Sequence, residues 1–407
     1  MSSFRRVLGI IVFALLLSGC WPTPGQGPDR RSFNASESTL TPERVGGLTE
    51  LFRAPLAGGA GPPVVTTDGL FVRTGLSIAA FEPDDGASRW TVPLPAAGWE
   101  DPSTTISDPH IVGGGLRQVV ATVTTVREEG IHESQLVTLA TGSGSLTRHP
   151  AAGTLSSLRG TSAATVDFAP GFGIESTSLQ LTGLDGTKTW GGLSFEARGG
   201  IASLGEGDLY LATGDQVQEY DTTAECPPYF GTQPPLICQT TWVRPIGSPV
   251  TPVVIGDVNT VYVGSTNAVV YALNRSAGGF RWRSVVGSPI TRPPALGGGT
   301  LFVASADGRV SALPAAGCGS PLCDVQWSTA TGSEITVQPA IAGRVVYVGS
   351  ADGTVKAFDA AGCGTSTCAP IWTVNTGSPV TGGLAVANGR LYVGTANAVV
   401  AYGLPPS

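Results

Sequence analysis

The sequence predicts an all-β protein, an eight-bladed β-propeller made of four-stranded antiparallel blades. Three observations lead to this prediction. A sequence unit returns every 40 to 52 residues, each unit contains short β-prone runs between turn residues, and a tryptophan recurs at one place in the unit. Repeats of this length are typical of propellers, whereas a β-solenoid would have a shorter unit.

The start of the unit is the clearest part of the repeat. A Gly-Ser-x-[Val/Ile]-Thr segment begins at Gly247, Gly287, Gly332 and Gly377, so the offsets are 40, 45 and 45 residues. An apolar stretch follows, and then a run of β-branched and aromatic residues such as 261–265 (VYVGS). Such runs between turn residues are typical of strands.

Tight turns separate the later strands of the unit. The dipeptides Asp307-Gly308 and Asp352-Gly353 suit two-residue hairpins, because these residue types accept the positive φ that such turns need. A third strand follows, and a Gly-x-x-x-Trp segment then leads into a fourth. We therefore expect four strands in each unit.

Six of the eight tryptophans share the position at the start of the fourth strand: Trp90, Trp190, Trp242, Trp282, Trp327 and Trp372. The interval from Trp90 to Trp190 is 100 residues, or two units, so one tryptophan is missing between them. Gly144 is followed at the usual spacing by Arg148, which places Arg148 where that tryptophan is expected. Units therefore start near residues 60, 101, 152, 197, 247, 287, 332 and 377.

The two ends of the repeat region complement each other. The last unit stops at the C-terminus without a tryptophan strand, whereas residues 48–56 read like an isolated outer strand. Pairing this N-terminal strand with the last blade would close the ring and remove its open edges. We therefore assign residues 47–407 to one propeller domain.

The motif A-x-[DN]-x-x-[TA]-G-x-x-x-W, seen at 272–282 and more loosely at 80–90, resembles the pyrroloquinoline quinone (PQQ) repeat. The resemblance covers roughly residues 47–407. It implies an eight-bladed propeller in which the blade tryptophans dock between neighbouring blades.

Proteins with this repeat fall into two branches. The quinoprotein dehydrogenases bind PQQ in the central channel, with a vicinal disulfide, a Ca²⁺ held by acidic and amide side chains, and a catalytic Asp. The other branch is not enzymatic and includes the propeller lipoprotein of the outer-membrane β-barrel assembly machinery. This chain has no adjacent cysteine pair, and it looks more like the second branch. We therefore predict no catalytic residue, no metal and no cofactor.

Two alternatives stay open at this point. One is a PQQ-dependent dehydrogenase, which would use PQQ and Ca²⁺. The other is a propeller that binds a carbohydrate or another small ligand at the channel mouth, for which Trp99, which lies outside the blade pattern, is the tryptophan candidate.

The first residues read as an export signal. Arg5 and Arg6 precede an apolar stretch of about 11 residues, which is too short to span a bilayer. Leu17-Ser18-Gly19-Cys20 matches a bacterial lipobox, so residues 1–19 are predicted to be a signal peptide and Cys20 to be lipidated. Residues 20–46 are rich in Pro, Gly and Ser and are predicted to be a flexible tether. The expected location is the extracytoplasmic face of a bacterial membrane.

The other six cysteines are predicted to form three local disulfides: Cys226 with Cys238, Cys318 with Cys323, and Cys363 with Cys368. The last two pairs come with a longer connection to the tryptophan, fifteen residues instead of ten, which explains the change of offset from 40 to 45. Two cysteines with four residues between them and no paired histidine are poor zinc ligands. Disulfides also fit an exported protein.

Little else in the sequence points to chemistry. The three histidines, His110, His132 and His149, are not clustered, and we expect them in solvated loops or at blade edges. A formal net charge of −7 and no basic patch argue against nucleic acid as a partner. The threonines that follow the repeat starts (Thr251, Thr291, Thr336 and Thr381) are expected around the channel, where they begin strands or form a polar ring. We predict a monomeric propeller that binds other envelope proteins.

Overall fold

The structure is a computed structural model that describes residues 20–21, 27, 29–95, 104–112, 117–126, 132–151, 154–159, 162–171, 174–185, 187–194, 200–226, 228–230, 233–236, 238–257 and 259–405. These residues form an all-β ring of eight blades, and the only helical turn among them is η2 (Val45–Gly47). The predicted fold is confirmed. No helix within these ranges is long and apolar enough to cross a bilayer.

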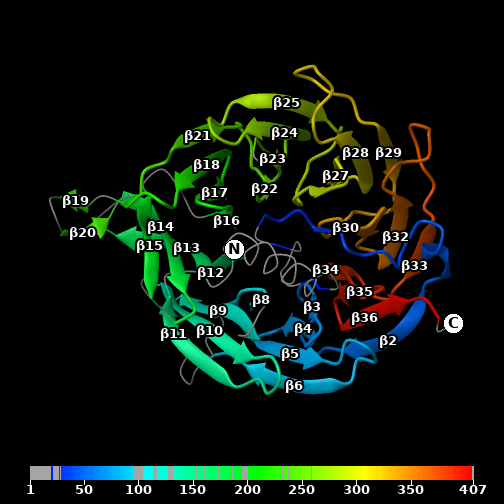
Figure 1. Ribbon diagram of the computed structural model, residues 1–407, viewed down its shortest axis with the longest axis horizontal. Helices are drawn as coiled ribbons and strands as arrows, with labels where there is room; N and C mark the ends of the chain where they lie inside the picture. The colour runs from blue at the N-terminus through cyan, green and yellow to red at the C-terminus, as the bar shows by residue number, and fades with distance from the viewer. Residues whose placement is uncertain are drawn as a thin grey trace, which may run out of the picture.

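The first half of the ring uses residues 64–245 (Figure 1). Blade 1 consists of β3 (Val64–Thr66), β4 (Gly69–Thr74), β5 (Ser77–Phe81) and β6 (Ser88–Pro93). Blade 2 consists of β7 (Thr105–Ile106), β8 (His110–Val112), β9 (Gln118–Val126), β10 (His132–Ala140) and β11 (Leu146–Ala151). Blade 3 consists of β12 (Thr154–Arg159), β13 (Ser162–Gly171), β14 (Ile174–Gly183) and β15 (Lys188–Ser194). Blade 4 consists of β16 (Ile201–Leu204), β17 (Asp208–Thr213), β18 (Gln216–Asp221) and β21 (Trp242–Pro245), with the hairpin β19 (Pro228–Phe230) and β20 (Gln233–Leu236) inserted before β21.

The second half repeats the same order. Blade 5 consists of β22 (Val254–Ile255), β23 (Thr260–Gly264), β24 (Val269–Asn274) and β25 (Phe280–Val285). Blade 6 consists of β26 (Ala295–Gly297), β27 (Thr300–Ser305), β28 (Arg309–Pro314) and β29 (Trp327–Ala330). Blade 7 consists of β30 (Ala340–Ala342), β31 (Val345–Gly349), β32 (Thr354–Asp359) and β33 (Trp372–Asn375). Blade 8 consists of β34 (Val380–Ala387), β35 (Arg390–Thr395), β36 (Ala398–Gly403) and the N-terminal strand β2 (Thr49–Pro55).

Burial explains the sequence pattern of the strands. The second strand of a blade is covered on both faces by the neighbouring blades, so β23 and β31 are buried at every residue and read as unbroken β-prone runs. The outer strand has one side toward solvent, and β25 accordingly alternates between exposed and buried residues over Arg281–Val285. The core therefore lies between the blades.

The ring closes as predicted. Strand β2 pairs antiparallel with β36, with Thr49 opposite Gly403 and Pro55 opposite Ala398. Phe52 on β2 lies against Gly86 of blade 1, where a Cβ would be 2.3 Å from the ring of Phe52. Phe52 thus takes the place of the missing tryptophan of blade 8.

The same packing explains the Gly-x-x-x-Trp motif. Gly278 has a φ of +63°, and a Cβ at this position would lie 2.4 Å from the ring of Trp242 in the preceding blade. A side chain is therefore excluded both by the backbone conformation and by the indole. Among the described residues, a glycine in the turn before the fourth strand makes room in this way for the aromatic ring of the preceding blade. The same pairs recur around the ring: Gly144 with Trp90, Gly317 with Trp282, and Gly362 with Trp327.

Most of the indole N–H groups also bond to the next blade. The Nε1 atoms donate to carbonyl oxygens as follows: Trp90 to Thr141 (3.1 Å), Trp190 to Ala224 (2.7 Å), Trp242 to Arg275 (3.0 Å), Trp282 to Ala315 (3.2 Å) and Trp372 to Leu48 (3.2 Å). In blade 2, Arg148 lies opposite Val137, as Trp90 lies opposite Ala80 in blade 1. The second blade has therefore kept its register without its tryptophan.

The N-terminal segment differs from the flexible tether that the sequence predicts for residues 20–46. Figure 1 shows its described part in blue, running from the centre of the ring along β30 toward the rim. Strand β1 (Phe33–Asn34) pairs parallel with β30, and the side-chain amide of Asn34 donates to the carbonyl of Val386 at 2.9 Å. Glu37 accepts hydrogen bonds from the backbone N–H groups of Thr39 and Gly389. Residues 29–46 are thus part of the folded domain.

The physical reason lies in the innermost strands. Each has one edge facing the channel, with backbone groups that need partners. The carbonyls of Asp29, Arg31 and Ser32 accept hydrogen bonds from these strands, namely from the N–H groups of Ile255 (2.9 Å), Leu296 (2.8 Å) and Ile341 (2.8 Å). Trp21 likewise exchanges two backbone hydrogen bonds with Val65. We call residues 29–34 the channel segment.

Candidate functional site

The central channel holds a cavity of about 320 Å³. Its walls come from the start of the innermost strands of several blades, and Arg30 and Ser32 of the channel segment also line it. Of the threonines expected here, Thr336 and Thr381 line the cavity. The hydroxyl of Thr251 instead accepts the N–H of Gly264 at 3.0 Å, which is the role of a residue that begins a strand.

Charged side chains from separate parts of the chain meet in this cavity. Arg30, Arg73 and Arg292 line it together with a single carboxylate, that of Asp108. Arg73 and Asp108 form an ion pair at 2.8 Å. Arg292 is exposed at the mouth and, within the described part of the chain, has no hydrogen-bond or ion-pair partner. The channel therefore has more positive than negative charge, in a chain whose net charge is −7.

Arg30 is held in place by backbone groups. Its Nη2 donates to the carbonyl oxygens of Ser156 and Ala202, while its Nε is buried with no partner among the described residues. The side-chain amide of Gln338 donates to the carbonyl of Arg30 at 3.0 Å. Burial lowers the pKa of the Arg30 guanidinium to about 10, although nearby Asp108 opposes this shift. Arg30 is thus a fixed cation whose charge is not balanced by a dedicated carboxylate.

His110 does not lie in a solvated loop, as the sequence led us to expect. It begins the innermost strand β8 and is only 6% exposed. Burial lowers the pKa of its imidazole to about 3, and the positive charge of Arg30 lowers it further in the same direction. His110 is therefore neutral near pH 7. His149 is half-buried on β11, and the side chain of His132 lies outside the described residues, as does Trp99.

These residues do not fit the calcium ion of the enzymatic branch. A bound Ca²⁺ takes six to eight oxygen ligands, mainly carboxylates and carbonyls. The channel offers one carboxylate, Asp108, which is already paired with Arg73, and it places two further guanidinium groups nearby. These guanidinium groups would repel a divalent cation. Within the described ranges, no group of three or more His, Cys, Asp or Glu side chains could hold a metal elsewhere.

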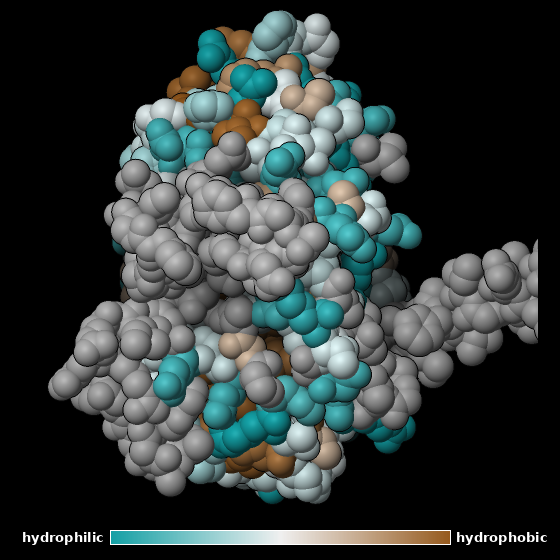
Figure 2. Space-filling view, turned by 90° about the vertical axis from the view of Figure 1, so that its left-hand side faces the viewer, coloured by the Kyte–Doolittle hydropathy of each residue, from teal (hydrophilic) through white to brown (hydrophobic). Residues whose placement is uncertain are grey.

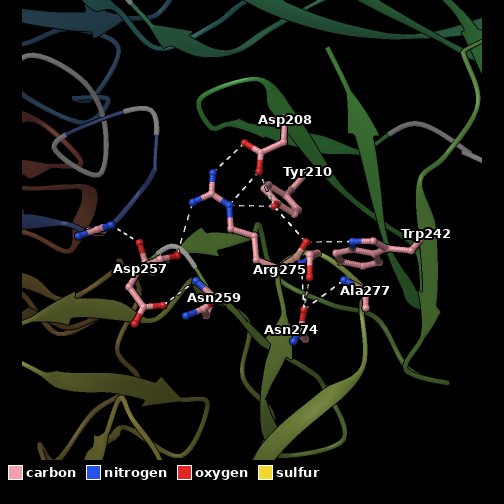
Figure 3. Close-up of polar contacts among 11 residues, drawn as sticks. Asp208, Tyr210, Trp242, Asp257, Asn259, Asn274, Arg275 and Ala277 are labelled. Atoms are coloured by element: carbon pink, nitrogen blue, oxygen red, sulfur yellow. Dashed lines mark hydrogen bonds and ion pairs between the residues drawn. The ribbon is translucent and has the colours of Figure 1, made fainter. Parts of the chain in front are cut away.

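A second polar cluster joins blades 4 and 5 (Figure 3). Arg275 binds Asp208 through two hydrogen bonds, from Nε to Oδ2 at 2.8 Å and from Nη2 to Oδ1 at 2.9 Å. Tyr210 donates to Asp208 at 2.6 Å, and burial together with this hydrogen bond raises the pKa of the phenol. The carbonyl of Arg275 also accepts the indole N–H of Trp242. Every member has a partner, so we assign this inter-blade clasp (Asp208, Tyr210, Arg275 and Trp242) a structural role.

The three predicted disulfides are present: Cys226–Cys238, Cys318–Cys323 and Cys363–Cys368. Two of the closed loops cover the outer strand of the preceding blade. Leu322 forms a parallel bridge with Arg283 on β25, and the N–H of Ser328 on β29 donates to the carbonyl of Ser366. The loops thus occupy edges that would otherwise be open.

Breaking the disulfide that closes the longest of these loops should lower the stability of the protein measurably. We expect the double variant C226S/C238S to lose about 3 kcal/mol of unfolding free energy, because the unfolded chain regains the entropy of an open loop. The double variant C318S/C323S, with a separation of 5 instead of 12 residues, should lose about 2 kcal/mol. Urea unfolding of both variants and the parent protein gives the comparison. Equal stability of the parent protein with and without a reductant would contradict this expectation.

Cys20 is the free cysteine within the described ranges and is buried, with 2% of its surface exposed. Burial raises the pKa of its thiol, and the adjacent Trp21 is bound to β3. Lipidation of Cys20 stays a prediction from the lipobox.

Comparisons with known proteins agree with the fold. The family described as outer membrane protein assembly factor BamB matches residues 235–362. The crystal structure of BamB from Moraxella catarrhalis aligns with a TM-score of 0.61 at 16% identity, covering 88% of this chain and 99% of that one. A quinohemoprotein alcohol dehydrogenase, ADHIIG from Pseudomonas putida HK5, aligns with a TM-score of 0.68 at 12% identity, covering 96% and 82%. A comparison with curated proteins found no match.

A computationally designed protein, Ika8, is similar to the same extent, with a TM-score of 0.59 at 14% identity over 87% of this chain and 99% of that one. Identities this low show the fold alone. The ring, its repeat and its tryptophan packing define the class: this chain is an eight-bladed β-propeller with a PQQ-like fold. Within that class, residues 235–362 are similar to BamB, and the three disulfides indicate an extracytoplasmic protein.

Proposed function

We propose that the chain is an exported lipoprotein whose propeller is a non-catalytic scaffold for another protein of the cell envelope. The lipobox ending at Cys20 supports the lipid anchor, and the disulfides support export. The similarity of residues 235–362 to an assembly factor supports a role in binding proteins.

The observation that carries the proposal is the state of the central channel. The chain's own channel segment hydrogen-bonds to the innermost strands, and arginines line the space that remains. The alternative, a PQQ-dependent dehydrogenase, needs a Ca²⁺ site in this channel, and the ion pair of Asp108 with Arg73 leaves no free carboxylate among the residues that line the cavity. The geometry therefore favours a binding protein over a quinoprotein enzyme.

The outer rim of blades 5 and 6 offers a surface for the partner. Phe280, Val285 and Leu322 are 52%, 59% and 53% exposed, although side chains of this size are usually covered. They lie on β25 or on the loop that bridges to it. Figure 2 shows apolar residues at the top of the ring, the side on which Figure 1 places β25. We call these three residues the apolar rim.

The first experiment separates the scaffold from the enzyme. Isothermal titration of the full chain with PQQ and Ca²⁺, beside an assay of dye-linked alcohol and sugar oxidation, is expected to show no Ca²⁺-dependent binding of PQQ and no turnover. Tight stoichiometric binding with turnover would overturn the proposal in favour of the dehydrogenase.

The second experiment tests the anchor and the rim. Labelled palmitate should be incorporated into the parent protein and not into the variant Cys20→Ser. Cross-linking in intact envelopes should capture a partner with the parent chain, and the double variant F280S/L322S should lose it. Ile201→Ser is the matched control, because Ile201 is an exposed apolar residue of blade 4, outside the rim. Equal capture by the rim variant and the control would remove the rim from the proposal.

A further inference from the structure

We propose that the central channel binds a small organic anion with two or more negative charges, with Arg292, Arg30 and Arg73 as its cationic contacts. This binding site is separate from the apolar rim and does not depend on the proposed scaffold function.

The first argument is the shape of the site. The cavity has about 320 Å³, which is at the lower end of the range for small-molecule sites. Arg30 and Ser32 of the channel segment line one part of it, and the arginines of blades 1 and 6 line others. The backbone of the channel segment is held by hydrogen bonds to Ile255, Leu296 and Ile341, so this wall is fixed before a ligand arrives. A preformed wall lowers the entropic cost of binding.

The second argument is unbalanced charge. Three guanidinium groups share the cavity with one carboxylate, so an excess of two positive charges remains. His110 next to Arg30 is neutral and does not change this balance. Like charges in a cavity of low dielectric constant repel one another more strongly than in water. An anion with two charges would compensate the excess.

The third argument is hydrogen-bonding capacity that the protein leaves unused. Arg292 has no partner within the described residues, and the Nε of Arg30 is buried without one. The exposed guanidinium of Arg292 is therefore free to donate to a ligand oxygen at the mouth of the cavity. Guanidinium groups bind carboxylates and phosphates through paired N–H donors. The ligand chemistry is therefore that of a di- or tricarboxylate or a phosphate ester.

The experiment is an isothermal titration of the full chain, purified in detergent, at low ionic strength. Citrate, succinate and inorganic phosphate are the anionic probes and distinguish the two oxyanion types, and glycerol is the uncharged probe. We expect one site per chain for at least one anion and none for glycerol. High salt should weaken the binding, because it screens the attraction.

The variant Arg292→Gln tests the residue assignment. It should weaken anion binding at least tenfold, because a charge-assisted hydrogen bond contributes more than a neutral one. Arg292 is exposed at the mouth and packs no core, so the variant should melt at the parent temperature. Arg344→Gln is the matched control, because the Arg344 side chain is 62% exposed, pairs with Asp359 and does not line the cavity.

Absence of binding for all three anions to the parent chain would overturn the proposal. So would equal affinities of the variants Arg292→Gln and Arg344→Gln. Citrate binding without oxidation activity supports the anion site and leaves the scaffold function as proposed. Loss of partner capture by the rim variant with unchanged citrate binding shows that the two sites are independent.

Discussion

The variant Arg275→Met is expected to destabilise the propeller by about 2–3 kcal/mol, between the cost of breaking a surface pair and that of breaking a fully buried one, and the largest single-residue effect that we predict. Arg275 and Asp208 are 19% and 15% exposed and form a two-point ion pair between blades 4 and 5. Methionine keeps much of the side-chain volume but leaves the carboxylate of Asp208 without its cation. A half-buried carboxylate that loses its cation costs more free energy than the intact pair contributes to stability. Urea unfolding of the parent and variant proteins measures the difference.

A double-mutant cycle shows whether the pair itself is responsible. The variant Asp208→Asn should also be destabilised, because Arg275 then loses its carboxylate. The double variant should lose less than the sum of the two single variants, with a coupling of about 1–3 kcal/mol. The surface pair Arg344 and Asp359 is the control, and Arg344→Met should cost less than about 1 kcal/mol. Additive effects at Asp208 and Arg275 would show that the clasp does not act as a pair.

Several contacts of this fold can be predicted from the sequence because they repeat from blade to blade. The Gly-x-x-x-Trp motif predicted the blades, because the packing of one indole on the next glycine is local to two neighbouring repeats. The closing strand was predictable for the same reason, since the last repeat lacked a strand that the N-terminus supplied. Phe52 was harder to recognise, because only the structure shows that a different aromatic ring fills the tryptophan position. Contacts that recur in every blade are therefore visible as a repeated motif in the sequence.

No repeated sequence motif marks the residues that line the central channel. Arg30 and Arg292 are more than 200 residues apart, and the arginine at position 292 is not repeated: the equivalent positions after the repeat threonines are Pro252, Val337 and Gly382. Only closure of the ring brings these arginines together. The channel segment was misread for a different reason. Its Pro, Gly and Ser content is typical of a linker, but its backbone carbonyls meet unpaired N–H groups on the innermost strands. Composition does not report partners that come from distant strands.

His110 was misjudged because the second repeat is degenerate. Without a tryptophan in this repeat, the strand positions of residues before Gln118 cannot be assigned from the pattern, and an isolated histidine is usually exposed. In the structure it begins β8 and is buried close to Arg30, and its ring nitrogen Nδ1 lies 3.2 Å from the carbonyl oxygen of Asp108. This position gives the histidine a clear effect on stability.

We expect stability to fall as the pH is lowered below 6.5, and His110 to be a main cause. Its folded-state pKa is about 3, below the ordinary value of 6.5, so the unfolded chain takes up a proton first. The sign follows from linkage: stability rises with pH wherever the unfolded state binds more protons. The contribution of neutral His110 is therefore complete above pH 6.5 and is lost progressively as the pH falls toward 3. Between pH 7 and pH 5 the expected loss is about 2 kcal/mol.

The variant His110→Asn isolates this effect, because asparagine has a similar polarity and does not titrate. Urea unfolding of the parent and variant proteins at pH 5, 6 and 7 should give curves that converge at low pH, since the variant has no proton to take up at this site. The control is His149→Asn on the half-buried outer strand β11, for which we expect the same unfolding free energy as for the parent protein at pH 5, 6 and 7. Parallel curves for the parent and His110→Asn would mean that the imidazole is not held neutral beside Arg30. They would also weaken the picture of a channel with excess positive charge, because that charge is one of the two causes of the low pKa of His110.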